Sequence, residues 1–426
     1  MNLFELLRNR MFFLVDKLLR NKKITNVLTS LEEFDQSKNK SHIQNAKIDN
    51  LLAEVKSSTE FYKTFGSTNF NQLPIITKEY LAENREKFIS NRFNKDDLIK
   101  VSTSGSYGTP MTFYRTKQKQ MRQIAEVIFL GKHINYYIGR HHAFIRGVSK
   151  NKINLLLQNE VHIDPTKLDE PSLEKMRKKV KKTKFIIGFP SVILSLIKYC
   201  EEMGDTSKDF KLLGIITTAE PLTENQRGLM KGFFNCNVVA RYAMEELGLI
   251  ATQCVHTENY HINEASFIVE VLQKESDRTA RFGEEGRIII TDLDSNAMPL
   301  IRYDSGDFGV LQQKCSCGFD GKVLKTISGR KIQNILDSKG NIISPFSINV
   351  MMKDYENIYQ FQFVQEGINQ YHLLLVTNNK FKGKDSLLAD LYKILGTDAN
   401  IEVFIVDEIN PLPSGKRPYI INKLDI

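Results

Sequence analysis

The sequence has no run of apolar residues long enough to cross a membrane, since a spanning helix needs about 18. It lacks a convincing secretory signal peptide, because Glu5, Arg8, Arg10 and Asp16 interrupt the apolar residues near its start. Cysteine is scarce and odd in number, with five in 426 residues, so a disulfide framework is not expected. These absences predict a cytoplasmic protein in a reducing compartment.

The first 20 residues nevertheless have an amphipathic pattern. Apolar side chains recur there at intervals of three and four residues, at Phe4, Leu7, Met11, Leu14 and Leu18. This spacing predicts one face of a helix. The basic helix has two interpretations: it docks on its own domain, or residues 1–20 make peripheral contact with a membrane surface.

Composition indicates a globular protein of two or three domains, with 41% apolar and 26% charged residues. The net charge of +9 fits an anionic small molecule, a nucleic acid or an acidic membrane equally well. The basic residues do not alternate with aromatic ones in any recognisable nucleic-acid module, so no nucleic-acid partner is expected. No feature predicts an oligomeric state.

The order of apolar runs predicts the fold class. Short strand patterns alternate with helical ones between residues 185 and 242, which is typical of an α/β sheet. Residues 261–312 are strand-rich, residues 1–95 are mostly helical, and the last 95 or so form a small α+β unit. The predicted elements are helices at Lys117–Lys132, Pro190–Met203, Leu222–Phe234 and Asp385–Leu395, and strands at Phe185–Gly188, Leu212–Thr217, Val238–Tyr242, Tyr359–Val364, Tyr371–Val376 and Ile401–Val406, with a turn around Glu366–Gly367.

Three loops have residues suited to nucleotide chemistry. Backbone N–H groups and hydroxyls in Thr103–Pro110 can wrap phosphates, although the loop lacks the Walker lysine. Asp307 follows a glycine turn and can accept hydrogen bonds from ribose hydroxyls. Lys416, on a Pro/Gly-rich loop, can bring positive charge to a transferring phosphoryl group. Taken singly, each has an alternative: a surface loop, a hairpin turn with a solvated carboxylate, and a surface lysine.

Six motifs occur in series: the loop near residue 105, Thr218-Ala-Glu-Pro221, Tyr242-Ala-Met-Glu-Glu246, Arg302-Tyr-Asp-Ser-Gly-Asp307, Ser328-Gly-Arg330 and Pro413-Ser-Gly-Lys416. Over roughly residues 75–420 this series resembles the adenylate-forming superfamily of acyl- and aryl-CoA ligases. Within it the chain looks most like the phenylacetate–CoA ligase branch, which includes the CapK-type proteins of capsular polysaccharide loci.

The resemblance implies an α/β fold with a large N-terminal adenylate-forming domain of mixed sheets and helices and a small mobile C-terminal α+β domain. We expect the large domain at residues 1–328, a hinge at 329–330 and the small domain at 331–426. The small domain would rotate about the hinge between the two half-reactions.

The resemblance also implies roles for single residues. The phosphates of ATP would be held by Ser104, Gly105, Ser106 and Gly108. The adenine pocket would be formed by Ala219, Glu220 and Pro221, with Tyr242 stacked on the base.

The implied catalytic residues are Lys416, Glu246 and Arg330. Glu246 would bind Mg²⁺, Asp307 and Arg330 would hold the ribose, and Lys416 would bridge the substrate carboxylate and the α-phosphate. The sequence departs from the wider superfamily at Thr109, where a lysine is common, at Ala243, where glycine is usual, and at Glu245, where Thr or Ser is usual.

The implied reaction is ATP-dependent activation of a small-molecule carboxylic acid to an acyl-adenylate, with release of pyrophosphate. Acyl transfer to CoA would follow, as in an AMP-forming acid–thiol ligase. One alternative is amide or ester transfer to a sugar or other acceptor in capsular polysaccharide biosynthesis. Another is a nucleotide-binding protein that has lost catalysis.

Cysteine and histidine residues form a candidate metal site. Cys254 and His261 precede a strand-rich stretch, and Cys315 and Cys317 follow it. Three thiolates and an imidazole can build a tetrahedral structural zinc site, and the related branch has matching residues. His256 is the rival nitrogen ligand, and reduced cysteines packed at a domain edge are the alternative to zinc.

Overall fold

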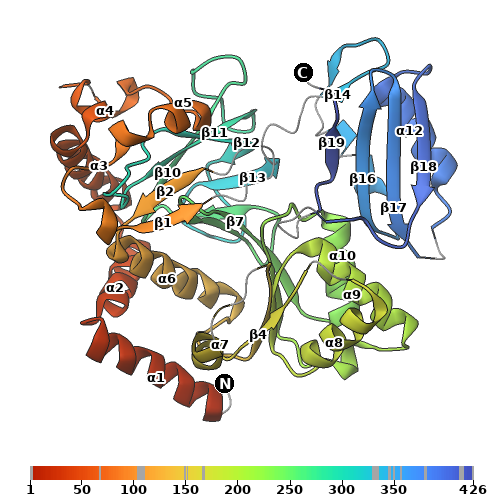
Figure 1. The fold of residues 1–426 in the computed structure, drawn as a ribbon, viewed down its shortest axis with the longest axis horizontal. Coiled ribbons are helices and arrows are strands. Elements are labelled where there is room, and N and C mark those ends of the chain that lie inside the picture. The colour runs from red at the N-terminus through yellow and green to blue at the C-terminus, as the bar shows by residue number, and fades with distance from the viewer. Residues whose placement is uncertain are drawn as a thin grey trace. The chain divides into compact units, whose positions relative to one another are not determined.

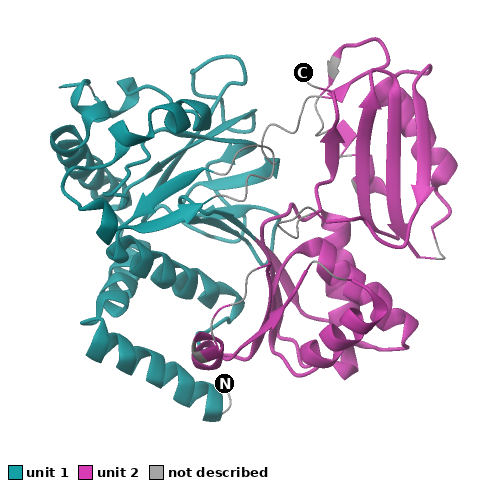
Figure 2. Ribbon diagram, in the orientation of Figure 1, with its two compact units in different colours: residues 1–139, 241–330 teal, residues 140–240, 331–426 magenta. Residues whose placement is uncertain are grey.

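The computed structural model describes residues 3–66, 69–102, 111–147, 150, 152–165, 168–328, 335–343, 347–348, 351–355, 357–378, 381–411 and 417–424 (Figure 1). The chain forms two compact units, each built from two stretches of sequence (Figure 2). Unit 1 contains residues 1–139 and 241–330, and unit 2 contains residues 140–240 and 331–426.

Unit 1 begins with a helical segment, as the sequence predicts. Its helices are α1 (Leu3–Leu19), α2 (Lys23–Gln36), α3 (Lys40–Ser58), α4 (Glu60–Lys63), α5 (Lys78–Glu83) and α6 (Lys117–Gly131). Helix α2 packs on α6, and the two share a small apolar core that includes Leu31 and Ile128. The short strands β1 (Ile99–Ser102) and β2 (Thr112–Arg115) pair with each other in antiparallel fashion.

The second stretch of unit 1 is an antiparallel sheet. Its strands are β8 (Gly248–Gln253), β9 (Tyr260–Ile262), β10 (Phe267–Leu272), β11 (Glu285–Asp292), β12 (Tyr303–Gln312) and β13 (Val323–Ser328). They lie in the order β10-β11-β12-β13-β9-β8, and β8 pairs with the end of β7 (Asn237–Met244). The N-terminal segment joins this sheet at one point, where Ile76 forms a parallel bridge with Tyr303.

Unit 2 starts with a parallel sheet of strands β3 (His142–Ile145), β4 (Glu160–Ile163), β5 (Phe185–Gly188), β6 (Gly214–Thr217) and the start of β7, in the order β7-β6-β5-β3-β4. Strands β5 and β6 are buried at every residue, which is why their sequences are continuous apolar runs rather than alternating ones. The connecting helices are α7 (Lys152–Gln158), α8 (Glu170–Val180), α9 (Pro190–Glu202) and α10 (Glu224–Phe234).

The C-terminal part of unit 2 is a small α+β layer. Its elements are β14 (Ile335–Leu336), β15 (Ile342–Ile343), β16 (Ile358–Gly367), β17 (Gln370–Thr377), α12 (Lys384–Leu395), β18 (Asn400–Ile405) and β19 (Ile420–Asn422). Four of the strands form a sheet in the order β18-β17-β16-β19, and the buried side of α12 packs on it through Leu387, Leu391 and Leu395. Tyr359 and Val376 belong to the same apolar core as α9, so the two stretches of unit 2 are packed together.

The predicted α/β class with large mixed sheets and helices is confirmed. The turn predicted around Glu366–Gly367 lies two residues later, because β16 continues through Gly367 and the chain turns at Ile368–Asn369. A register shift between Gln365 and Gly367 absorbs the glycine into the strand. The proposed boundary residues Gly329 and Arg330 lie outside the described residues, so the division into 1–328 and 331–426 stays a prediction. Among the described helices, none has the length and apolar character needed to cross a membrane.

Candidate nucleotide site and cysteine–histidine cluster

Several predicted site residues lie outside the part of the chain that the structure describes. They are Ser104, Gly105, Ser106 and Gly108 of the phosphate loop, together with Arg330 and Lys416. The described members of the predicted site are Ala219, Glu220, Pro221, Tyr242, Glu246 and Asp307.

Tyr242 and Asp307 are bonded to each other. The Tyr242 hydroxyl, on β7, donates to Oδ2 of Asp307, on β12, over 2.7 Å, and both side chains are buried. Asp307 faces Tyr242 because β12 contains a bulge: its register against β11 shifts at this point, and Gly306 has a φ of +76°. The glycine therefore lies within a bulged strand, and the alternative of a hairpin turn with a solvated carboxylate is wrong.

Glu246 is held in a similar way. It lies in the turn between β7 and β8, and the Tyr303 hydroxyl donates to its Oε1 over 3.1 Å. Tyr303 belongs to β12, as Asp307 does, and is 1% exposed. Two hydrogen bonds thus connect β12 with the segment formed by β7 and the turn after it. In one of them β7 supplies the tyrosine and β12 the carboxylate, and in the other β12 supplies the tyrosine and the turn the carboxylate. Tyr303 was missed as a site residue, although it lies inside the Arg302-Tyr-Asp motif.

Arg302, also in that motif, has a structural role. Its guanidinium forms two bonds with the Glu270 carboxylate, at 3.2 and 3.0 Å, and donates to the carbonyls of Asn71 and Leu73. The backbone of Arg302 has a φ of +50°, in the left-handed region that residues other than glycine rarely adopt. Arg302 therefore fastens the N-terminal helical segment beside the start of β12.

The turn that holds Glu246 is supported from a third element. Gln123, on α6, donates to the Leu247 carbonyl over 3.0 Å and accepts from the Arg115 guanidinium of β2. Burial lowers the pKa of Arg115, and the charge of Glu245 opposes that effect. Glu245, a departure from the usual superfamily residue, thus has a cationic neighbour, which was not foreseen from the sequence.

The Ala219–Pro221 motif in unit 2 is tied to the segment after Lys416. Glu220 Oε1 accepts from the Ser191 hydroxyl at 3.0 Å and from the Arg417 backbone N–H at 2.9 Å, while Oε2 accepts from the Ser191 backbone N–H at 3.0 Å. Burial raises the pKa of Glu220, and these backbone donors oppose that rise. Ala219 has a φ of +68°, and the Tyr419 hydroxyl donates to the Pro221 carbonyl over 2.8 Å.

Arg417 is itself anchored inside unit 2. Its guanidinium donates to the carbonyls of Ile409 and Pro165 and forms an ion pair with Glu408 at 2.7 Å. Arg417 is 3% exposed. Because it directly follows Lys416, these bonds fix one end of the lysine loop next to Glu220. The signal in the sequence was the second basic residue of Lys416-Arg417, which had no assigned role.

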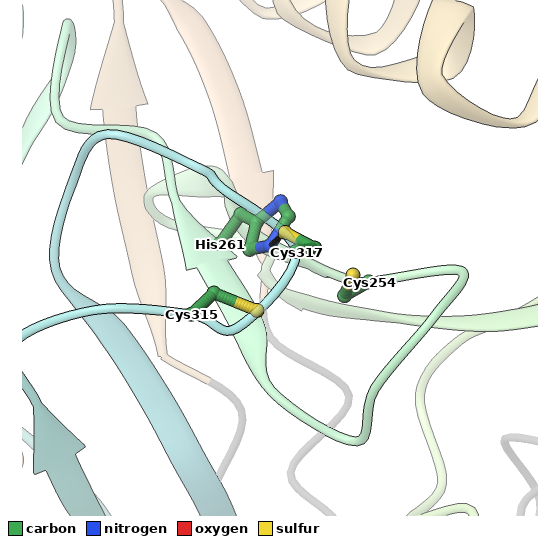
Figure 3. Close-up of side chains that lie close together, drawn as sticks. All are labelled: Cys254, His261, Cys315 and Cys317. Carbon is green, nitrogen blue, oxygen red and sulfur yellow. Dashed lines mark hydrogen bonds between the residues drawn. The ribbon is translucent and has the colours of Figure 1, made fainter.

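The structure brings the predicted cysteine–histidine cluster together (Figure 3). The ligand atoms of Cys254, His261, Cys315 and Cys317 all lie within 4.8 Å of one another. His261 belongs to β9, Cys254 follows β8, and the other two cysteines lie between β12 and β13. The rival His256 is not a member of this cluster; its backbone N–H donates to Cys254 Sγ over 3.4 Å.

The side chains of this cluster differ in protonation, and burial raises the pKa of the Cys317 thiol to about 11. Burial lowers the pKa of His261 to about 4, which leaves its ring neutral at pH 7. Burial would raise the pKa of Cys315, but donors that include the Thr257 hydroxyl lower it to about 7. A neutral imidazole and ionisable thiols are the donors that Zn²⁺ takes in structural sites.

Comparison with known proteins gives consistent results. Residues 335–423 match the family model described as the CapK C-terminal domain. Protein CapK of Staphylococcus aureus is 26% identical over 411 residues, which covers 90% of this chain and 89% of that protein. The phenylacetate-coenzyme A ligase of Thermus thermophilus is 26% identical over 167 residues, 38% of this chain and 37% of that protein.

A solved structure has the same fold over nearly the whole chain. It is 2-hydroxyisobutyryl-CoA ligase in the postadenylation state in complex with R3-HIB-AMP. The TM-score is 0.76 at 14% sequence identity, and the match covers 92% of each chain.

Proposed function

We propose that the chain belongs to the adenylate-forming superfamily, in the branch of CapK and the phenylacetate–CoA ligases, and that it activates a carboxylic acid by forming an acyl-adenylate from ATP. The observation that supports this most directly is the pair of tyrosine–carboxylate bonds between β7 and β12. They orient the carboxylate assigned to the ribose, Asp307, and the one assigned to Mg²⁺, Glu246, from the same two segments.

Each half of this pair has a distinct task in the proposal. Asp307 would accept hydrogen bonds from the ribose hydroxyls, while Tyr242 keeps its carboxylate turned toward the nucleotide. Glu246 would hold Mg²⁺, which offsets the negative charge of the phosphates when it is bound. Tyr303 keeps the Glu246 carboxylate in place and is a positioning residue.

Lys416 is proposed to act on the reacting groups. The substrate carboxylate attacks the α-phosphorus, a bond to its oxygen forms, and the bond to the pyrophosphate oxygen breaks. Both partners are anions, so a cation between them lowers the repulsion on approach. The hydrogen bond that the Arg417 backbone N–H donates to Glu220 supports this role, because it holds the residue after Lys416 at the Ala219–Pro221 motif.

For the second step we propose acyl transfer to CoA, with rotation of the region after residues 329–330 to admit the acceptor. The relation to phenylacetate-coenzyme A ligase supports CoA. A second candidate is amide or ester transfer to another acceptor such as a sugar, which the resemblance to the CapK-type proteins of capsular polysaccharide loci implies; the match to protein CapK covers 90% of this chain. ATP and a small-molecule carboxylic acid are the partners common to both candidates.

We also propose that the cysteine–histidine cluster is a structural zinc site. The three sulfur atoms and one imidazole nitrogen would fill all four positions, which leaves none for a substrate. Purified protein should contain about one zinc per chain by elemental analysis, and Cys315→Ser should abolish it while Cys236→Ser, outside the cluster, should not. Metal-free protein of unchanged thermal stability would exclude this role.

The test of the main proposal is pyrophosphate release from ATP and Mg²⁺ with a panel of aryl, fatty and amino acids. Hydroxylamine in the assay captures any acyl-adenylate, so the acceptor need not be known. We expect release that depends on one class of acid and falls by roughly a hundredfold or more in Lys416→Ala. Lys393→Ala, on an exposed lysine of α12, is the matched control. Absence of ATP binding in the intact protein would overturn the proposal.

A further inference from the structure

Helix α1 turns its apolar side outward. Six of its apolar side chains are between 45% and 75% exposed: Leu3, Phe4, Leu7, Met11, Leu14 and Leu18. Its two acidic residues are the buried ones, with Glu5 4% and Asp16 0% exposed. The helix docks on its own domain through Phe12 and Phe13, which are partly buried against the core that α2 and α6 share, so the exposed stripe is a second apolar face that its own domain does not cover.

Polar contacts on the inner side hold the helix in this orientation. The Asp16 carboxylate accepts from the backbone N–H groups of Ile24 and Thr25 at 3.1 and 2.9 Å, so it caps the first turn of α2. Asn9 donates to the Ile138 carbonyl over 3.0 Å. The backbone at Gly139 approaches so closely that an added Cβ would lie 2.9 Å from Asn9 N. Rotating the apolar side inward would break all of these contacts.

Cationic side chains border the apolar stripe. At 100° per residue, Arg10 and Lys17 fall along one edge of the stripe and Arg8 along the other. Arg10 and Lys17 are exposed, as are Lys22 and Lys23 just beyond the helix. An apolar stripe about 100° wide with basic residues at its borders is the pattern of a helix that lies in a membrane interface.

We propose that α1 docks on an anionic lipid surface, with its leucines among the acyl chains and its basic residues at the headgroups. A second copy of the chain fits less well. If two α1 stripes packed antiparallel in a symmetric dimer, Arg10 and Lys17 of one copy would meet the same edge of the other, and if they packed parallel they would meet the edge that carries Arg8. The docking does not depend on the reaction that the chain catalyses.

The experiment is co-sedimentation of the intact protein with vesicles of phosphatidylcholine alone and of phosphatidylcholine with phosphatidylglycerol in a three-to-one ratio. The wild-type protein should sediment with the anionic vesicles and much less with the neutral ones. High salt should weaken the binding, because it screens the headgroup charges.

Two double variants separate the contribution of the apolar side chains to vesicle binding from that of the basic side chains. Leu7→Gln with Leu14→Gln should weaken binding by about a hundredfold, at roughly tenfold per leucine withdrawn from lipid. Arg10→Gln with Lys17→Gln should weaken it by about twenty-fivefold, at roughly fivefold per basic residue. The matched control is Leu213→Gln with Ile368→Gln, on leucine and isoleucine side chains exposed elsewhere, and it should bind as the wild type does.

Each variant is also followed by thermal unfolding, which should not change because the substituted side chains are exposed. Three outcomes would overturn the proposal. The first is that the protein does not sediment with anionic vesicles, and the second is that it binds both kinds of vesicle equally and independently of salt. The third is that the wild-type protein binds no vesicles but forms a dimer in solution, which the double variant Leu7→Gln with Leu14→Gln dissociates. The last outcome would assign the stripe to a second copy.

Discussion

The carboxylates of the candidate site are held in two different ways in the two units. In unit 1, Asp307 and Glu246 accept hydrogen bonds from the side-chain hydroxyls of Tyr242 and Tyr303. In unit 2, Glu220 accepts from two backbone N–H groups and a serine hydroxyl. A hydroxyl orients a carboxylate without constraining the main chain around it, whereas backbone donors fix the chain that supplies them.

This difference separates ligand binding from chain positioning. The unit 1 arrangement suits carboxylates that meet a ribose and a metal ion, because their donors are side chains that can adjust. The unit 2 arrangement suits a carboxylate that keeps the residue after Lys416 in one place. Substitution of Asp307 or Glu246 in unit 1 should therefore change activity with little effect on stability, and substitution of Glu220 in unit 2 should change both.

The largest effect is expected for Glu246→Gln. The substitution removes the negative charge of the carboxylate that is proposed to bind Mg²⁺, and it should lower kcat/KM for ATP by roughly a hundredfold to a thousandfold. The melting temperature should stay close to that of the wild type. Glu275→Gln, on an exposed glutamate, is the control, measured with the same pyrophosphate assay over a series of Mg²⁺ concentrations. An unchanged Mg²⁺ requirement would contradict the assignment.

Glu220→Ala should destabilise the protein and also reduce adenylation. It leaves the two backbone donors of Ser191 and Arg417 without their acceptor, at about 1–3 kcal/mol for each buried group. Thermal or urea unfolding should show a loss of about 2–6 kcal/mol in the free energy of unfolding. Glu220→Gln keeps an acceptor and should recover part of both losses. A stable Glu220→Ala variant with full activity would show that the anchor is unimportant.

Tyr303→Phe and Tyr242→Phe should have smaller and different effects. Each removes one hydrogen bond, about 0.5–1.5 kcal/mol or roughly twofold to tenfold. Tyr303→Phe should raise the Mg²⁺ concentration needed for half-maximal rate, while Tyr242→Phe should raise the KM for ATP. If each variant changed both parameters equally, the two bonds would not have separate tasks.

Glu160 gives a third case, a carboxylate held by cations. Burial raises its pKa, but His142, Lys150 and Arg146 outweigh burial and lower the pKa to about 2. Its stabilisation is therefore fully present above the unfolded pKa of about 4.3 and is lost as pH falls toward 2. Glu160→Gln should lower the melting temperature by several degrees at pH 7 and flatten the decline of the melting temperature between about pH 4 and 2.

Glu220 should have the opposite effect on the pH dependence of stability. Because burial raises its pKa, its contribution to the free energy of unfolding should fall as pH rises above about 4.3.

The sequence was sufficient for the elements whose pattern is local. The strands β5 and β6 and the helices α9, α10 and α12 were predicted within about two residues, because apolar runs and helical spacing are visible without tertiary contacts. The pairing of Cys254 and His261 with Cys315 and Cys317 was also predicted, since metal-binding residue types are rare and recognisable.

The remaining features depend on contacts between distant parts of the chain. Nothing in the neighbourhood of Tyr303 shows that its hydroxyl reaches Glu246, 57 residues away. The role of Arg417 depends on Glu220, 197 residues away. In the sequence Arg417 is simply a second basic residue beside Lys416, and nothing indicates that the two have different roles. The sequence did not predict whether the apolar stripe of α1 faces solvent or the rest of unit 1, because periodicity defines a stripe but not the direction in which it points.

The first 95 residues show no nucleotide motif, yet they contact the strand that contributes most to the candidate site. Ile76 pairs with Tyr303, and Arg302 donates to the carbonyls of Asn71 and Leu73. A one-residue slip of a strand moves every side chain to the opposite face. We infer that this contact helps β11 and β13 to keep β12 in register, and so helps to keep Asp307 facing Tyr242. In the proposed function, an insertion near residue 75 should therefore weaken ATP binding, although it changes none of the residues assigned to ATP.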